Sequence, residues 1–274
     1  MGTRLHAQLD DERFQSGADK YADYLKTPEG RLRLDIAFRN LQEFLPQDTR
    51  SLRALDVGCG TGVFAVRLAR LGVEVRLLDL SEPMLDYAKR AAREAGVTEK
   101  ITFQCGDASQ LADLYEARSF DVVLGHNILE YVEDPCAVVR SAARILRDPS
   151  SITSVLVRNQ AGEVLKAAIK DGDLAVAEQN LTAEWGHESL YSGKVRLFAR
   201  ESLRAMLARA SLEVTAERGV RVLSDYLPAS VSRDDEYERI FELERILGKR
   251  PEFAPVARYT HSIARHRADH EGRG

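Results

Sequence analysis

The chain has 274 residues, of which 44% are hydrophobic and 30% are charged, and its formal net charge at neutral pH is −4. This composition is typical of a globular domain in water, and the small net charge gives no general attraction to nucleic acid. Three cysteines without a C-x-x-C pair argue against a disulfide framework and against a zinc site. The apolar runs are too short to cross a bilayer, and the N-terminus lacks the apolar core of a signal peptide. We therefore expect a cytoplasmic protein with no membrane span and no bound metal.

Apolar strands and amphipathic helices alternate along the first half of the chain. Residues 1–30 are polar, and a helix is predicted over 31–45, where Pro46 ends it. Ser81 and Pro83 mark the start of a later helix. Strands and helices that alternate at this interval predict a parallel sheet covered on both faces. The expected strands are 53–57, 73–78, 101–105, 120–124 and 152–157, and the expected helices are 62–71, 82–95, 108–115 and 135–146.

The pattern becomes less regular after residue 157. Residues 159–198 are expected to be helical but irregular, and the tail 267–274 to be disordered because it has nothing to bury. Further along, we expect a helix at 201–210, strands at 213–218 and 257–264, and a charged helix at 234–247. We interpret residues 1–274 as one domain. Its expected parts are an N-terminal helical segment (1–50), a core (51–158, 200–219 and 254–266), a first insertion (159–199) and a second insertion (220–253).

Residues 54–62 read A-L-D-V-G-C-G-T-G, so that three glycines at alternate positions follow the first strand. A dinucleotide fingerprint has glycines at its first, third and sixth positions. Here the glycines are Gly58, Gly60 and Gly62, and the sixth position is Val63. A pyrophosphate therefore does not fit in the usual way. A tight turn without any ligand is the alternative.

The D-x-G-x-G-x-G form resembles motif I of the class I S-adenosylmethionine-dependent methyltransferases. Three later segments strengthen the resemblance: L-L-D-L-S (77–81), C-G-D-A-S-Q (105–110) and G-H-N-I-L-E-Y-V-E-D-P (125–135). The resemblance implies an α/β, Rossmann-like fold with a seven-stranded, mostly parallel sheet and helices on both faces. It also implies an N-terminal helical lid, two insertions, and S-adenosyl-L-methionine as the cofactor.

The same resemblance implies roles for single residues. Asp79 would bind the ribose hydroxyls and Asp107 the adenine amino group, with a helix N-cap as the alternative for each. Arg33 would pair with the methionine carboxylate, with a solvated helix arginine as the alternative, and His126 would line the cofactor pocket. The implied cofactor residues are Arg33, Asp56, Gly58, Gly60, Thr61, Gly62, Asp79, Leu80, Gly106, Asp107, Ala108 and His126.

A second resemblance covers most of the chain, from about residue 20 to residue 266. The segments G-V-R-V-L-S-D-Y-L (219–227) and A-R-Y-T-H-S-I-A-R (257–265) carry it. They are similar to segments of the bacterial methyltransferases that esterify 5-carboxymethoxyuridine at the tRNA wobble position. This resemblance implies tRNA as the partner and a carboxylate as the methyl acceptor.

A carboxylate is ionised at neutral pH, so it needs a cation to hold it rather than a base. Arg221 and Arg258 are the candidates because a guanidinium group binds a carboxylate through two parallel hydrogen bonds. With Tyr226, which would add a hydrogen bond, they are the expected catalytic residues. The alternative is that Arg221 and Asp225 form a structural ion pair.

Two other functions stay open from the sequence. One is a small-molecule O- or N-methyltransferase, whose acceptor would be a small carboxylate, and the other is a cofactor-binding protein without catalysis. Residues 221–267 hold nine Arg/Lys and eight Asp/Glu, so a cationic track for RNA phosphates must lie elsewhere. The sequence indicates no oligomeric state. The candidate cations are Lys166, Lys170, Lys194, Arg196, Arg200, Arg31 and Arg39.

Overall fold

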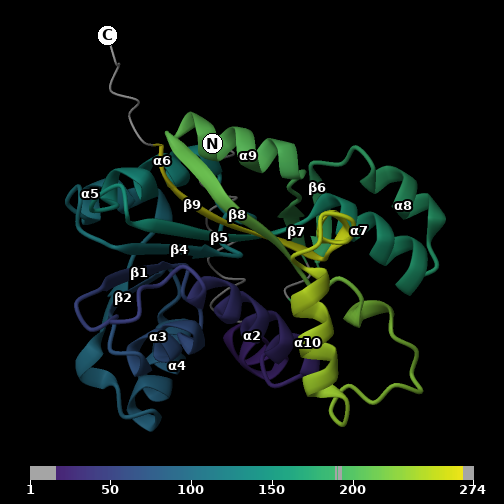
Figure 1. Cartoon of the computed structure of the whole chain (residues 1–274), viewed down its shortest axis with the longest axis horizontal. Coiled ribbons are helices and arrows are strands. Elements are labelled where there is room, and N and C mark those ends of the chain that lie inside the picture. The colour runs from purple at the N-terminus through teal and green to yellow at the C-terminus, as the bar shows by residue number, and fades with distance from the viewer. Residues whose placement is uncertain (1–16, 189, 191–192, 268–274) are drawn as a thin grey trace.

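The computed structural model describes residues 17–188, 190 and 193–267. Its main sheet has seven strands in the order β3-β2-β1-β4-β5-β9-β8 (Figure 1). The first five strands run parallel, and β9 is antiparallel to both of its neighbours. The predicted seven-stranded, mostly parallel sheet is therefore confirmed. The strands are β1 (Arg53–Val57), β2 (Glu74–Asp79), β3 (Ile101–Cys105), β4 (Val122–His126), β5 (Ile152–Arg158), β8 (Leu212–Val220) and β9 (Tyr259–His266).

Helices cover both faces of the sheet, as the alternating sequence predicted (Figure 1). On one face lie α2 (Pro28–Gln42), α3 (Val63–Arg70), α4 (Glu82–Glu94) and α10 (Tyr237–Leu247). The other face is covered by α5 (Leu111–Leu114), α6 (Pro135–Ile145) and α9 (Arg200–Arg209). A hydrophobic core lies on each face of the sheet, and successive residues of β1 point to opposite faces. Ala54 packs into the core beneath α2, α3 and α4, and Leu55 into the core beneath α5, α6 and α9.

The N-terminal helix begins and ends a few residues earlier than the apolar pattern predicted. The helix α2 starts at Pro28 because Thr27 caps it, and the side chain of Thr27 accepts a hydrogen bond from the backbone N–H of Gly30 at 3.1 Å. Residues 17–24 form a further helical segment ahead of α2. Residues 1–16 lie outside the described part of the chain, and the proposed lid is therefore described only from residue 17 onward.

The first insertion differs from the helical expectation for 159–198. It begins with α7 (Gln160–Leu165), a π-helical turn (Lys166–Lys170) and α8 (Leu174–Asn180), but then forms an antiparallel pair of strands. These are β6 (Trp185–Glu188) and β7 (Gly193–Arg196). The helical prediction is wrong over these strands, where each carries a glycine and apolar residues do not recur at helical spacing.

The remaining differences are at element ends. Phe120 forms only an isolated bridge with Leu146, so β4 starts at Val122 rather than at residue 120. Arg267 is hydrogen-bonded through its backbone N–H to Ser211 O at 2.9 Å, so it continues the ordered chain, and the rest of the tail lies outside the described residues. Short 3₁₀ turns occupy Thr98–Lys100, Ala108–Gln110, Ser224–Tyr226 and Ala254–Val256. No helix within the described ranges is long and apolar enough to cross a membrane.

Candidate functional site

The glycine loop is a bare bend at the carboxyl end of β1. Gly58, Gly60 and Gly62 all have positive φ angles, of 67°, 53° and 69°. A Cβ atom on Gly58 would lie 2.7 Å from Ile128 Cδ1, and one on Gly62 would lie 2.7 Å from Ala88 Cβ. Neither position can therefore carry a side chain, both for backbone strain and for space. The loop leaves exposed backbone beside the first turn of α3.

Asp79, which ends β2, is tied to this loop. Its carboxylate accepts hydrogen bonds from the backbone N–H of Gly60 at 2.7 Å and of Ser81 at 2.9 Å. Ser81 caps α4, as predicted, by accepting a hydrogen bond from Met84 N at 3.4 Å. Burial raises the pKa of Asp79. The carboxylate of Asp79 thus stabilises the glycine loop through the hydrogen bond from Gly60. It lies next to the bend where a ligand would lie.

Asp56 is a buried carboxyl two residues before the first glycine. It is 3% exposed, and burial together with the charge of Asp79 raises its pKa to about 7. Two carboxyls placed this close in a buried site repel each other when both are ionised. A cationic ligand in the bend would reduce this electrostatic repulsion between Asp56 and Asp79.

A cavity opens between the glycine loop, the end of β4 and the N-terminal helices. Five of the predicted cofactor residues line it, namely Arg33, Asp56, Gly58, Thr61 and His126. The hydroxyl of Thr61 is buried and has no hydrogen-bond partner in the described structure. A buried hydroxyl without a partner costs free energy, so it is suited to a ligand that supplies one.

The other predicted cofactor residues extend from this cavity along the same edge of the sheet. Gly106 N donates to Asp79 O at 3.0 Å, which joins the ends of β3 and β2. Asp107 accepts a hydrogen bond from Ser109 N at 2.7 Å and caps the turn Ala108–Gln110, as its alternative interpretation predicted. Leu80 is 37% exposed beside these ends. These residues therefore lie at the carboxyl ends of β2 and β3, on the same edge of the sheet as the glycine loop.

Arg33 is buried rather than solvated, so the alternative interpretation of this residue is wrong. It is 6% exposed, and its Nη1 donates to Asn127 Oδ1 at 2.9 Å while its Nη2 donates to the Tyr21 hydroxyl at 2.9 Å. Asn127 has a φ of 56° and also donates to Glu130. Tyr21 and Asn127 line the cavity too, and the sequence analysis missed both. The helical segment 17–24 therefore covers the cavity.

Four arginines gather around Tyr259 at the start of β9. We call Arg33, Arg158, Arg221 and Arg258 the arginine cluster. The guanidinium carbons of Arg33, Arg158 and Arg221 lie 5.7, 5.8 and 6.0 Å from the centre of the Tyr259 ring. Burial by itself would raise the pKa of this hydroxyl, but the charges of the arginine cluster outweigh it and lower the pKa to about 8.

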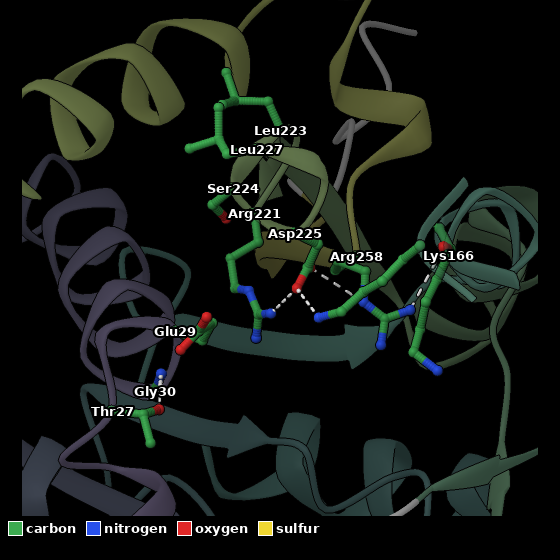
Figure 2. Close-up of polar contacts among 12 residues, drawn as sticks. Thr27, Glu29, Gly30, Lys166, Arg221, Leu223, Ser224, Asp225, Leu227 and Arg258 are labelled. Carbon is green, nitrogen blue, oxygen red and sulfur yellow. Dashed lines mark hydrogen bonds and ion pairs between the residues drawn. The ribbon is translucent and has the colours of Figure 1, made fainter. Parts of the chain in front are cut away.

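Two carboxylates hold the arginine cluster together. Arg221 pairs with Asp225, which also lies 3.4 Å from Arg258 Nε (Figure 2). The same carboxylate lies 3.5 Å from Lys170 Nζ. Glu163 accepts from Arg158 and from Arg258, each at 2.9 Å. The ion pair between Arg221 and Asp225 that the alternative interpretation supposes is therefore present, and the expected role of Arg221 toward the acceptor stays a prediction. Arg158, Arg221 and Arg258 share these two carboxylates, and Arg33 pairs with neither of them, so the cluster keeps a surplus of positive charge.

Tyr226 directly follows Asp225 in the 3₁₀ turn Ser224–Tyr226. Its hydroxyl is buried without a hydrogen-bond partner among the described residues, and burial raises its pKa to about 12. Tyr226 therefore remains a neutral donor at any working pH. Its expected role toward the acceptor stays a prediction.

Glu244 positions the loop that carries Arg221. Arg221 has a φ of 61°, and the next three backbone N–H groups all donate to the carboxylate of Glu244, from Val222 at 2.5 Å, Leu223 at 3.0 Å and Ser224 at 2.7 Å. Glu244 is on α10 and is fully buried. Because α10 carries several glutamates, the sequence did not indicate that Glu244 is buried.

We expect Glu244→Gln to destabilise the protein by about 2 kcal/mol, because an amide presents only one oxygen to three N–H donors. Urea unfolding measures this difference. The matched control is Glu242→Gln on the same helix, where the carboxylate forms an exposed pair with Arg245 at 2.7 Å, and its loss should leave the free energy of unfolding nearly unchanged. Equal effects of the two changes would contradict the role of Glu244.

The candidate cations for an RNA track are mostly engaged with this chain. Arg196 lies 4.5 Å above the Trp185 ring. Four others pair with carboxylates: Arg31 with Asp234, Lys166 with Asp171, Lys170 with Asp225, and Arg200 with Glu217. The exposed pairs of Arg31 and Lys166 are weak, so they do not prevent contact with phosphate. Lys170 and Arg200 instead pair with the buried carboxylates of Asp225 and Glu217. The described residues include no group of three or more metal-ligating side chains.

The strand order, the bare bend after β1 and the carboxylate ending β2 define the class: a Rossmann-like fold built to hold a nucleoside at the carboxyl edge of its strands. A model of the methyltransferase-domain family matches residues 48–211, and the chain belongs to the S-adenosylmethionine-dependent methyltransferases. Its cofactor is S-adenosyl-L-methionine. The bare bend, the unpartnered Thr61 hydroxyl and the buried carboxyl of Asp56 fit this cation.

More particularly, the chain is similar to the tRNA 5-carboxymethoxyuridine methyltransferase of Escherichia coli (strain K12), with 30% identity over 259 residues, 94% of this chain and 97% of that protein. It is also similar to the ubiquinone biosynthesis O-methyltransferase of Methylococcus capsulatus, with 34% identity over 144 residues, 52% of this chain and 58% of that protein.

Solved structures show the same fold. The CcbJ methyltransferase from Streptomyces caelestis superimposes with a TM-score of 0.60 at 20% identity, covering 92% of this chain and 96% of that chain. An S-adenosylmethionine-dependent methyltransferase from Thermotoga maritima gives a TM-score of 0.59 at 16% identity, covering 93% and 99%.

The structure suggests a direct test of the predicted cofactor contact at Asp79. We expect Asp79→Ala to raise the dissociation constant for the cofactor by about tenfold or more, because the variant loses both the ribose partner and the brace under Gly60. Calorimetry measures the constant. The control is Asp86→Ala, which removes an exposed carboxylate of α4 paired with Lys89. Cofactor binding by Asp79→Ala at wild-type strength would show that the contact is absent.

Proposed function

We propose that this methyltransferase esterifies a carboxylate, and that the carboxylate belongs to 5-carboxymethoxyuridine at the wobble position of tRNA. The arginine cluster carries the proposal. It lies against the cofactor cavity through Arg33, which it shares with that cavity, and it holds more positive charge than its own carboxylates neutralise. A buried surplus of guanidinium groups is suited to an anionic partner.

In this proposal the two anions of the reaction occupy neighbouring positions. Arg33 would bind the methionine carboxylate of the cofactor, and Arg221 with Arg258 would hold the acceptor carboxylate by one oxygen. Asp79 would bind the ribose, Asp107 the adenine, and the loop from Gly58 to Gly62 the methionine and ribose. Tyr226 would donate to the acceptor through its unpartnered hydroxyl.

The chemistry needs positioning rather than a base. When bound, the cofactor supplies a methyl group activated by positively charged sulfur. With one acceptor oxygen held by Arg221 and Arg258, the other would lie in line with this methyl group, and transfer with loss of the carbon–sulfur bond would give a methyl ester and S-adenosylhomocysteine. The ester is neutral, so the arginine cluster would bind the product more weakly than the acceptor carboxylate. Tyr21 and the helical segment 17–24 would exclude water during transfer.

The relatives support the acceptor in different ways. The Escherichia coli protein named for 5-carboxymethoxyuridine aligns over nearly the whole chain, so the alignment includes both insertions. The relative named for ubiquinone biosynthesis aligns over about half of the chain. A small-molecule O-methyltransferase therefore remains the second candidate function.

The test is methyl transfer from labelled cofactor to bulk bacterial tRNA or to small carboxylic acids. We expect label in tRNA that mild alkali releases, because an ester hydrolyses where N-methyl and ether products do not. Label in tRNA that resists alkali would exclude ester formation. Label only in the small acids would favour the second candidate function over the tRNA acceptor.

A further inference from the structure

A path of hydrogen bonds runs from α2 through the sheet to the cofactor cavity. His126, which lines the cavity, has its Nε2 2.8 Å from Ser154 Oγ, and the same Oγ lies 2.8 Å from His261 Nε2. On the far side, His261 Nδ1 lies 3.4 Å from Asn40 Nδ2. Asn40, Ser154 and His261 are each 2% exposed or less. The path is therefore sealed from water except at His126.

The hydrogens along this path depend on one another. Ser154 has a single hydroxyl hydrogen, and within the described structure its Oγ contacts only the two imidazoles. A buried hydroxyl hydrogen without an acceptor is costly, so it points to one imidazole and the other imidazole donates to Oγ. The two histidines must then carry their hydrogens on different nitrogens.

The contact with Asn40 determines which of the two imidazoles donates to Ser154. Its amide nitrogen can only donate, so His261 Nδ1 accepts and carries no hydrogen. His261 is consequently protonated on Nε2 and donates to Ser154, which donates to Nε2 of His126. The hydrogen of neutral His126 is then on Nδ1, for which the structure shows no partner among the described residues.

Both imidazoles are neutral in this environment. Burial, aided by Arg218, lowers the pKa of His261 to about 3. Burial, then the charges of His261 and Arg33, lowers the pKa of His126 as well. Phe64 packs edge-on against His126 with ring centres 4.6 Å apart, which limits rotation of the ring. A neutral ring also avoids repelling the positive sulfur of the cofactor.

We propose that Asn40, His261 and Ser154 are positioning residues that hold His126 as its Nδ1–H tautomer, so that the cavity contains a hydrogen-bond donor and not a base. The inference rests on the cavity being the site of methyl transfer. A donor can hold an oxygen of an ionised acceptor but cannot remove a proton from one. This arrangement therefore favours a carboxylate as the methyl acceptor. It disfavours a phenol or an ammonium group, because each must first lose a proton.

Nitrogen NMR of the full chain with ¹⁵N-labelled histidine tests the tautomer directly, and His126→Gln and His261→Gln identify the two sets of signals. We expect His126 with its hydrogen on Nδ1 and His261 with its hydrogen on Nε2. In Ser154→Ala the signals of His126 should become those of a tautomer mixture. The matched control is Thr153→Ala, the neighbouring strand residue, whose hydroxyl donates instead to Val123 O at 3.1 Å; it should leave both histidines unchanged.

Methyl transfer gives the second readout. Ser154→Ala should lower kcat by about tenfold and leave the cofactor dissociation constant within about twofold, since one buried hydrogen bond is lost. Thr153→Ala should transfer methyl groups at the wild-type rate. A hydrogen on Nε2 of His126 in the wild type, or an unchanged tautomer in Ser154→Ala, would overturn the inference. Because the NMR result needs no acceptor, it stands apart from a failure of the tRNA assay.

Discussion

Replacing Arg221 with asparagine is expected to lower kcat/KM for the acceptor by about 100-fold while the cofactor dissociation constant changes by less than about twofold. The loss corresponds to two charge-assisted hydrogen bonds to the acceptor carboxylate, together about 3 kcal/mol. Asparagine is chosen because Arg221 has a φ of 61°, which asparagine adopts more readily than most residues. The change thus removes the guanidinium group without adding backbone strain.

Arg239→Asn is the matched control, because Arg239 lies on α10 with a side chain that is 83% exposed and pairs only weakly with Glu236. We expect wild-type transfer from it. Kinetics with saturating cofactor and calorimetry without acceptor separate the two effects. If Arg221→Asn weakened cofactor binding as much as acceptor methylation, Arg221 would serve the fold of the cavity and not the acceptor.

Asp56→Asn is expected to make the protein more stable and its cofactor binding weaker. The pKa of Asp56 is raised from 3.8 to about 7 by burial and by the charge of Asp79. A carboxyl with a raised pKa favours the folded state in its protonated form, so this contribution is complete below the unfolded pKa and is lost as pH rises through the folded pKa. At pH 8 the wild type bears the full cost of the buried charge, and the asparagine variant should be more stable by about 4 kcal/mol.

Urea unfolding between pH 5 and pH 8 measures this effect. The wild type should lose stability across that window, whereas Asp56→Asn should lose less, with Asp79 responsible for the remaining slope because its pKa is raised too. Cofactor affinity should fall by about tenfold in the variant, since the carboxylate no longer faces a cation. A wild type whose unfolding free energy is flat over this pH range would show that Asp56 is ionised at no cost.

Several features could be predicted from the sequence because they depend on neighbouring residues. The positive φ angles of the glycine loop and the start of α4 at Ser81 follow from local geometry. The start of α2 at Pro28 carried an equally local signal in Thr27, which the apolar pattern alone did not reveal. Motifs at the ends of β1, β2, β3 and β4 fall on one edge because parallel strands share a direction.

Other features of the site lay beyond sequence reasoning because they join distant segments. Arg33 meets Asn127, 94 positions away, and Asn40 meets His261, 221 positions away. Arg158 was given no role from the sequence, yet the pairing of β5 with β9 places it opposite Tyr259. The inward position of Glu244 likewise had no signal, since a glutamate on an amphipathic helix is usually solvated.

By itself the sequence determined the alternation of strands and helices, the bare bend after the first strand and the carboxylates that end the next two strands. These depend on steric rules and hydrogen bonds within a few residues. Only the tertiary structure decided that four arginines gather around Tyr259, three of them sharing two carboxylates, and that His126 is linked to Asn40 through the sheet. Burial and charge balance are properties of a packed volume, and residues far apart along the chain create them together.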